Sequence, residues 1–131
     1  MKNVLVVTAV SAVSALAASV VLSAPAHAGG DDDRVIRAGS CSGSADWKLK
    51  VKTDDGRLEV EGEVDSNTSG QTWAWKIKDN GKVAAKGSAT TSGRSGSFDV
   101  ERKIADKSGT DRIVFRATYA GQTCRGVISF G

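Results

Sequence analysis

The sequence predicts an all-β fold, a single antiparallel β-sandwich of about seven to eight strands with one disulfide bond. Three observations lead to this fold class. Apolar and polar residues alternate from Trp47 onward, turn residues recur about every 8–12 residues, and no stretch after the first 28 residues shows a helical period. The only two cysteines, Cys41 and Cys124, bracket nearly all of the alternating region.

Residues 1–28 are expected to form a secretory signal peptide. Lys2 is followed by an uncharged run over residues 4–22, and Ala26-His27-Ala28 has the small-x-small form of a peptidase site. We therefore expect a secreted, extracellular protein with no membrane span after processing. In an oxidising compartment two cysteines usually form a disulfide, and only one intramolecular pairing is possible here. Two free thiols or an intermolecular bridge are the alternatives.

Residues 29–38 are expected to be a flexible acidic tail. Its first half, Gly29–Asp33, consists of two glycines and three aspartates and has no apolar residue to bury. A short strand at Val35–Arg37 is possible in its second half. The β-sandwich domain is then expected over residues 39–131.

The first hairpin is expected to turn at Asp55-Gly56, because Asp-Gly favours the type I′ turn that joins two strands directly. The register that follows places three lysines opposite three glutamates: Lys52 with Glu59, Lys50 with Glu61, and Lys48 with Glu63. This pairing cancels the field of the lysine row within a Debye length. We therefore interpret the row as a solvated face and not as a polyanion site.

The second hairpin is expected around Asp79-Asn80-Gly81, between a strand with alternating Trp73, Trp75 and Ile77 and a strand of small residues. A three-residue loop with Gly81 in the left-handed conformation predicts Ala85 opposite Trp75 and Gly87 opposite Trp73.

Three further strands follow a polar loop over residues 90–96. They are expected around Phe98 and Val100, from Ile113 to Tyr119, and from Thr123 to Phe130.

Several segments resemble small secreted actinobacterial proteins of uncharacterised function with an immunoglobulin-like β-sandwich. They are the run from Cys41 to Lys50, the Asp55-Gly56 turn, Gly96-Ser97-Phe98, and the ending from Thr110-Asp111-Arg112 to Cys124-Arg125-Gly126. The resemblance implies that fold and a secreted habitat, and it carries no site. In antibody domains the disulfide joins strands B and F. Here Cys41 precedes the strand at Trp47 and Cys124 lies in the last strand, so we expect the bridge to join the two ends of the domain.

The residue inventory excludes most familiar catalytic sites. The one histidine, His27, lies in the predicted leader, which excludes a Ser-His-Asp hydrolase and His-ligated metals from the processed chain. Carboxylate chemistry remains, with Asp54 and Asp55 or Asp106 and Asp111 as candidate acid/base pairs. Aspartate is also common in turns for local hydrogen bonding. We expect no enzyme, no cofactor and no metal, with a small carboxylate-dependent hydrolase as an alternative.

The candidate ligand-binding residues are Trp73, Trp75 and Arg94. Two tryptophans two residues apart on a strand share one face and could stack on a sugar, although the same alternation is typical of a core strand. Arg94 lies in the exposed polar loop. The charged residues interleave along the chain, so no basic stripe for nucleic acid is expected.

We therefore expect a monomeric, non-catalytic interaction module whose partner is an unknown extracellular protein or glycan. A carbohydrate-binding module using Trp73 and Trp75 is the alternative.

Overall fold

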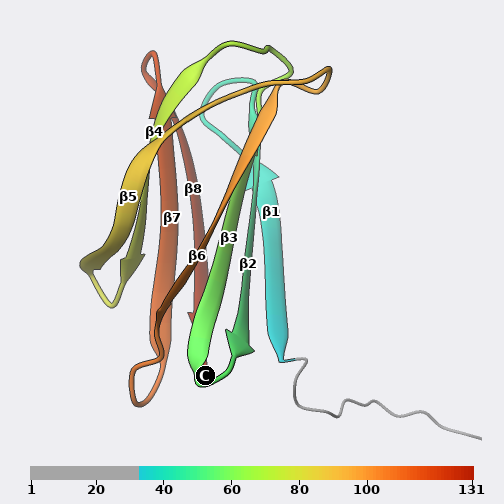
Figure 1. Cartoon of the computed structure of the whole chain (residues 1–131). Coiled ribbons are helices and arrows are strands. Elements are labelled where there is room, and N and C mark those ends of the chain that lie inside the picture. The colour runs from blue at the N-terminus through green and yellow to red at the C-terminus, as the bar shows by residue number, and fades with distance from the viewer. Residues whose placement is uncertain (1–32) are drawn as a thin grey trace, which may run out of the picture.

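The computed structural model describes residues 33–131, which form eight antiparallel strands in two facing sheets (Figure 1). The strands are β1 (Arg34–Ser40), β2 (Asp46–Asp54), β3 (Arg57–Asp65), β4 (Thr72–Asp79), β5 (Lys82–Thr90), β6 (Ser97–Ala105), β7 (Asp111–Tyr119) and β8 (Gln122–Phe130). The expected all-β sandwich is confirmed. In this part of the chain no helix is long and apolar enough to cross a membrane. The predicted signal peptide lies outside the described residues.

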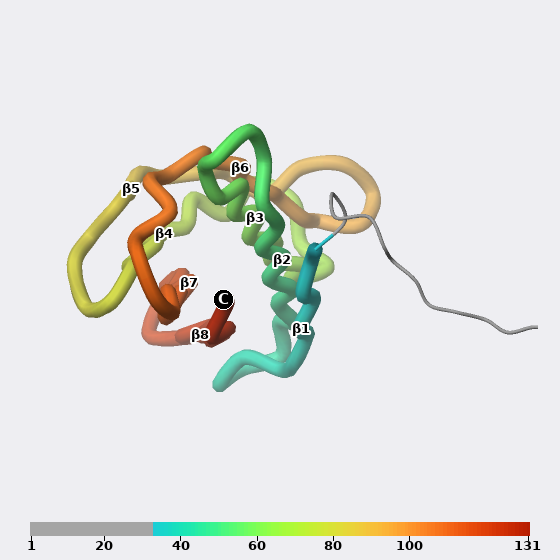
Figure 2. Tube along the Cα trace, turned by 90° about the horizontal axis from the view of Figure 1, so that it is seen from below, coloured from blue at the N-terminus to red at the C-terminus, as the bar shows by residue number. Residues whose placement is uncertain are grey.

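The strand order is that of an immunoglobulin-like sandwich. Sheet A has the order β1-β2-β3-β6 and sheet B the order β5-β4-β7-β8. β2, β3 and β6 take the places of strands A, B and E, while β5, β4, β7 and β8 take those of C′, C, F and G. β1 is an additional edge strand that pairs with β2. The two sheets are seen end-on in Figure 2, with β1 and β5 far apart.

β1 corrects the expected domain boundary. Residues 34–38 fall within the predicted tail, but the short strand that is possible at Val35–Arg37 is present as part of β1. This strand pairs with β2 in a continuous ladder from Arg34 opposite Lys52 to Ser40 opposite Asp46. Neither face of β1 is well buried. Val35 packs against the core, and the apolar side chain of Ile36 on the other face is 47% exposed. Its sequence therefore shows only a weak alternation. Residues 29–32 of the predicted tail lie outside the described residues.

The first hairpin has the predicted turn and register. Asp55 and Gly56 both have positive φ, at 54° and 77°, as a type I′ turn requires. All three predicted lysine–glutamate pairings are present in the ladder between β2 and β3. Lys50 Nζ lies 3.1 Å from Glu61 Oε1, and Lys48 Nζ lies 3.7 Å from Glu63 Oε1.

The predicted register of the second hairpin is wrong by two residues. Trp75 lies opposite Gly87 and Trp73 opposite Ala89. The loop has two residues, Asn80 and Gly81, both with positive φ, and the register shifts between Ile77 and Lys78. The register was predicted from a three-residue loop, and the turn residues give no information about this β-bulge. Its packing argument still holds, because a small residue faces each indole.

The core lies between the sheets and is filled by alternate residues of the strands. Its largest fully buried apolar side chains are Trp73, Phe115, Leu49, Leu58, Ile77, Ile113, Ile128, Val51, Val60 and Val64. This is the period-two pattern from which the fold was predicted.

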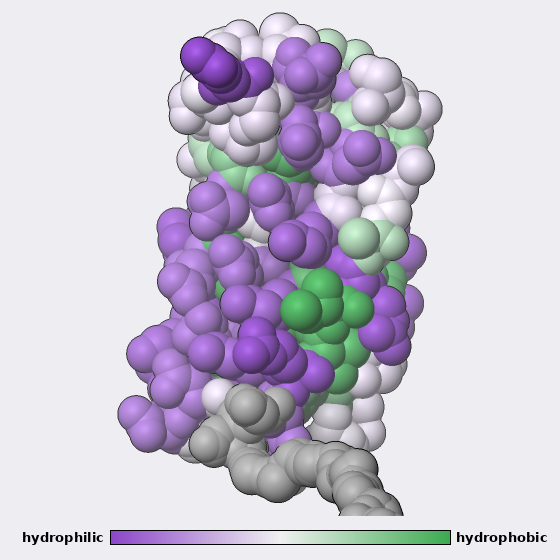
Figure 3. Space-filling model, turned by 90° about the vertical axis from the view of Figure 1, so that its right-hand side faces the viewer, coloured by the Kyte–Doolittle hydropathy of each residue, from purple (hydrophilic) through white to green (hydrophobic). Residues whose placement is uncertain are grey.

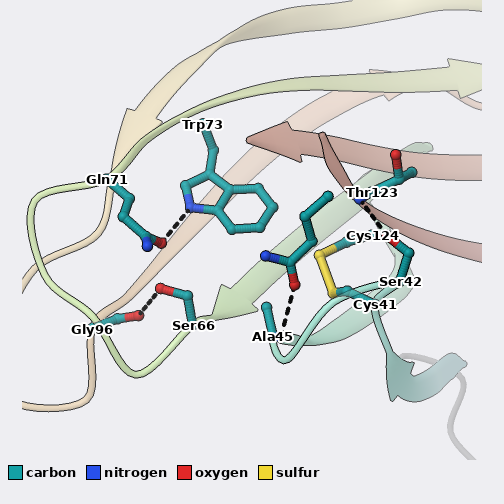
Figure 4. Close-up of a disulfide and its surroundings, with 10 residues drawn as sticks. Cys41, Ser42, Ala45, Ser66, Gln71, Trp73, Gly96, Thr123 and Cys124 are labelled. Carbon is teal, nitrogen blue, oxygen red and sulfur yellow. Dashed lines mark hydrogen bonds between the residues drawn. A yellow bond between two sulfur atoms is a disulfide. The ribbon is translucent and has the colours of Figure 1, made fainter. Parts of the chain in front are cut away.

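The predicted disulfide joins Cys41, in the loop between β1 and β2, to Cys124 in β8 (Figure 4). It therefore links sheet A to sheet B. Hydrogen bonds surround it: Thr123 N donates to Ser42 Oγ at 2.9 Å, and Ala45 N donates to the side chain of Gln122 at 2.8 Å.

Candidate anion-binding face

Trp73 and Trp75 lie inside the core and form no exposed stacking platform. Their side chains are 0% and 3% exposed. The ring of Trp73 stacks on Tyr119 with 5.4 Å between centroids, and its Nε1 donates to Gln71 Oε1 (Figure 4). The guanidinium of Arg102 lies 4.9 Å from the ring of Trp75. The structure therefore contradicts a sugar site built from these two indoles.

Arg94 lies in the exposed loop between β5 and β6, as expected. The base of this loop is held by Thr91, which is 1% exposed and whose Oγ1 donates to Thr68 O at 2.6 Å. No contact of the Arg94 side chain points to a ligand, so its binding role stays a prediction.

Of the aspartates proposed as acid/base pairs, Asp54 and Asp111 each have a different partner from the one expected. Asp54 Oδ2 lies 3.0 Å from Lys103 Nζ, and this hydrogen bond and charge lower the pKa of Asp54. Asp111 is 1% exposed and lies next to Asp79, which is 2% exposed. The sequence had not indicated this pairing. Within residues 33–131, no group of three or more His, Cys, Asp or Glu side chains could hold a metal ion.

Asp79 and Asp111 form a buried pair between the end of β4 and the start of β7. Burial, followed by the hydrogen bond and charge of Asp111, raises the pKa of Asp79 to about 6. Both oxygens of Asp79 and Oδ1 of Asp111 are buried and have no donor among the described residues. Loss of its solvation in this buried position disfavours the ionised form of Asp79, which is why its pKa is raised.

A set of basic side chains, here called the basic face, covers the outside of sheet B. Four of them lie side by side across all four strands, because Lys76 pairs with both Lys86 and Arg116, and Arg116 pairs with Arg125. Lys78 and Arg112 extend the basic face toward one end of the strands and share a surface hollow with Lys76, Arg116 and Arg125. Since neighbouring strands lie about 4.8 Å apart, the row of four spans roughly 14 Å.

The basic face has no acidic residue to balance it. The only carboxylates in the four strands of sheet B belong to Asp79 and Asp111, and both are buried. The ion pairs of residues 33–131 are Lys48–Glu63, Lys50–Glu61 and Lys103–Asp54, and none of them involves the basic face.

The outer face of sheet A differs in its charge pattern. Its lysines on β2 face the glutamates of β3, and these in turn lie beside Asp99, Glu101 and Lys103 of β6. The hydrogen bond and charge of Glu59 raise the pKa of Glu101, so acidic side chains approach each other there. Figure 3 shows this side as largely hydrophilic with one apolar patch. Both charge signs therefore mix on sheet A, while sheet B presents one sign.

The surface of sheet B is hollowed beside the row of four cations. An open hollow of about 330 Å³ is lined by Ala74, Trp75, Lys76, Lys78, Arg116 and Thr118. The methyl side chain of Ala74 is too small to fill this hollow. In the next cross-strand row, Ala74 lies between Ser88 and Thr118, and Thr118 pairs with Thr123. Hydroxyl groups thus lie next to the cations.

The sequence alone does not predict the basic face. The charges do interleave along the chain, but the strand order separates them between the two sheets. The one local sign was Lys76 and Lys78, two residues apart on a strand and without an acidic cross-strand partner.

Comparisons with protein families, with curated proteins and with solved structures found no match to this chain.

Proposed function

We propose that the protein is a secreted, non-catalytic interaction module that binds an anionic partner outside the cell through the basic face. The predicted signal peptide supports export, and the disulfide is compatible with an oxidising compartment. The observation that carries the proposal is the row Lys86, Lys76, Arg116 and Arg125, in which every cross-strand neighbour has the same charge.

Folding alone gives no reason for such a row. Like charges directly opposite each other in an antiparallel sheet are destabilising. The row contains three such pairs: Lys86 with Lys76, Lys76 with Arg116, and Arg116 with Arg125. On sheet A, Glu61 and Glu63 also face acidic residues of β6, but each of them has a lysine of β2 opposite it on its other side. A surface that lowers stability and attracts anions is typical of a binding site.

The experiment compares two double variants that each remove two positive charges. Lys76→Gln/Arg116→Gln alters the basic face, and Lys48→Gln/Lys50→Gln alters sheet A. Binding to sulfated dextran is measured by titration calorimetry at several salt concentrations. We expect the first variant to bind about tenfold more weakly than the parent and the second to bind as the parent does.

The same variants separate loss of binding from loss of folding. We expect Lys76→Gln/Arg116→Gln to unfold at the same or a higher temperature than the parent, because like-charge repulsion is removed. Equal losses of affinity in both double variants would show that only net charge matters and would contradict a dedicated face. The absence of any binding by the parent protein would contradict the proposal as well.

A further inference from the structure

We infer that the anionic partner is an acidic polysaccharide, and that the 330 Å³ hollow at Ala74 holds one of its sugar units. This inference rests on the proposed function and names its ligand class. The hollow combines what an acidic sugar needs. Lys76, Lys78 and Arg116 supply positive charge for a carboxylate, Thr118 supplies a hydroxyl group, and Ala74 leaves room for a ring.

A polymer fits this face better than a single anion does. The cations continue beyond the hollow in both directions across the sheet, to Lys86 on β5 and to Arg125 on β8. A chain with one acidic group per repeat can therefore meet several of them at once, which raises its affinity above that of one unit. Arg116 and Arg125 can each bind a carboxylate through two parallel hydrogen bonds.

The row beside the cations favours a sugar chain over other polyanions. Ser88, Thr118 and Thr123 carry hydroxyl groups that can exchange hydrogen bonds with sugar hydroxyls. Proteins that bind single-stranded nucleic acid stack bases on exposed aromatic rings. The strands of sheet B present no exposed aromatic ring on their outer face. Tyr119 packs against the buried Trp73, and the other four aromatic residues of these strands are buried: Trp73, Trp75, Phe115 and Phe130.

The test fills the hollow without changing any charge. Ala74→Ile places a bulky side chain in the hollow, and a β-branched residue suits a strand. Ser129→Ile is the matched control, because Ser129 is exposed on β8, pairs with Arg112, and does not line the hollow. Thr118→Val removes only the hydroxyl group. The probes are polygalacturonate, sulfated dextran, polyphosphate, single-stranded DNA and vesicles of anionic lipid.

We expect the parent protein to bind polygalacturonate more tightly than polyphosphate, DNA or vesicles of equal charge concentration. Ala74→Ile should weaken polygalacturonate binding about tenfold, Thr118→Val should weaken it less, and Ser129→Ile should leave it unchanged. Binding of Ala74→Ile to sulfated dextran should persist, because the six cations remain. Thermal unfolding of each variant checks that the fold is intact.

Two outcomes would overturn the ligand class and leave the proposed function standing. One is an unchanged affinity of Ala74→Ile for polygalacturonate. The other is a preference of the parent for polyphosphate, DNA or lipid vesicles, with the loss still confined to variants of the basic face. If polygalacturonate binds but Lys76→Gln/Arg116→Gln loses nothing, the basic face itself is excluded and both proposals fail. Salt-dependent self-association seen by sedimentation would instead identify a second copy of the chain as the occupant.

Discussion

Asp79 and Asp111 illustrate how single residues set the charge of a whole face. If these two carboxylates were exposed, they would neutralise part of the basic face. Both are instead buried, and the raised pKa of Asp79 shows that burial disfavours its ionised form. Their position at the end of β4 and the start of β7 thus keeps negative charge away from the surface of sheet B.

This pair predicts a loss of stability as the pH rises. The pKa of Asp79 is raised from 3.8 to about 6, so between these values the unfolded chain releases a proton that the folded chain retains. The free energy of unfolding should therefore be highest near pH 4 and fall until about pH 6. Since a tenfold change in proton affinity corresponds to about 1.4 kcal/mol, the loss should be on the order of 3 kcal/mol.

Asp79→Asn should remove most of this pH dependence and raise stability at pH 7.5. Urea unfolding at pH 4.5 and pH 7.5 measures both effects, with Asp99→Asn on the surface of sheet A as the control. A parent protein that becomes more stable between these pH values would contradict the account of the buried pair.

The first hairpin could be predicted in full because its information is local. Asp55-Gly56 specifies the turn, and the turn specifies the register of Lys48, Lys50 and Lys52 against their glutamates. The second hairpin could not, because its bulge between Ile77 and Lys78 depends on how β4 fits between β5 and β7. That fit is a property of the sheet and not of the turn residues.

Gly56 offers a test of the first turn. Its φ is +77°, and a Cβ added there would meet no other atom within 4 Å, so only backbone strain opposes substitution. Gly56→Ala should lower the free energy of unfolding by about 1 kcal/mol. Gly56→Asn should lower it less, because asparagine tolerates positive φ.

Gly126→Ala provides the contrasting case. No positive φ is involved there, but a Cβ would overlap the ring of Trp47. Chemical denaturation of Gly56→Ala, Gly56→Asn and Gly126→Ala compares their free energies of unfolding. A Gly56→Ala variant as stable as Gly56→Asn would mean that the turn adopts another conformation.

At the scale of the whole molecule, the fold class was predictable and the candidate site was not. Period-two alternation, turn residues and the two cysteines are visible in the sequence. Together they are enough to predict a β-sandwich with one disulfide bond. The basic face needs the strand order as well, because Lys76, Arg116 and Arg125 become neighbours only when β4, β7 and β8 lie side by side. Burial of Trp73 and Trp75 was favoured by their alternation with polar residues, but their exposure could be decided only once the facing sheet was known.

The disulfide is the feature on which the stability of the whole domain depends most. Cys41 and Cys124 lie 83 residues apart in sequence, so their bond restricts most of the unfolded chain. Cys41→Ser/Cys124→Ser should lower the free energy of unfolding by about 4.5 kcal/mol. Urea unfolding with the parent protein under oxidising and reducing conditions provides the comparison. If the double variant and the oxidised parent unfold at the same urea concentration, the bond does not stabilise the domain.

The one-sided placement of positive charge also affects how the protein meets its partner. A molecule whose cations lie on one face and whose other face carries mixed charge has its centre of charge displaced from its centre of mass. In the field of a negative surface such a molecule experiences a torque that turns sheet B toward that surface before contact. Random collisions are thereby converted into correctly oriented ones, so added salt should act mainly by slowing association and much less by speeding release.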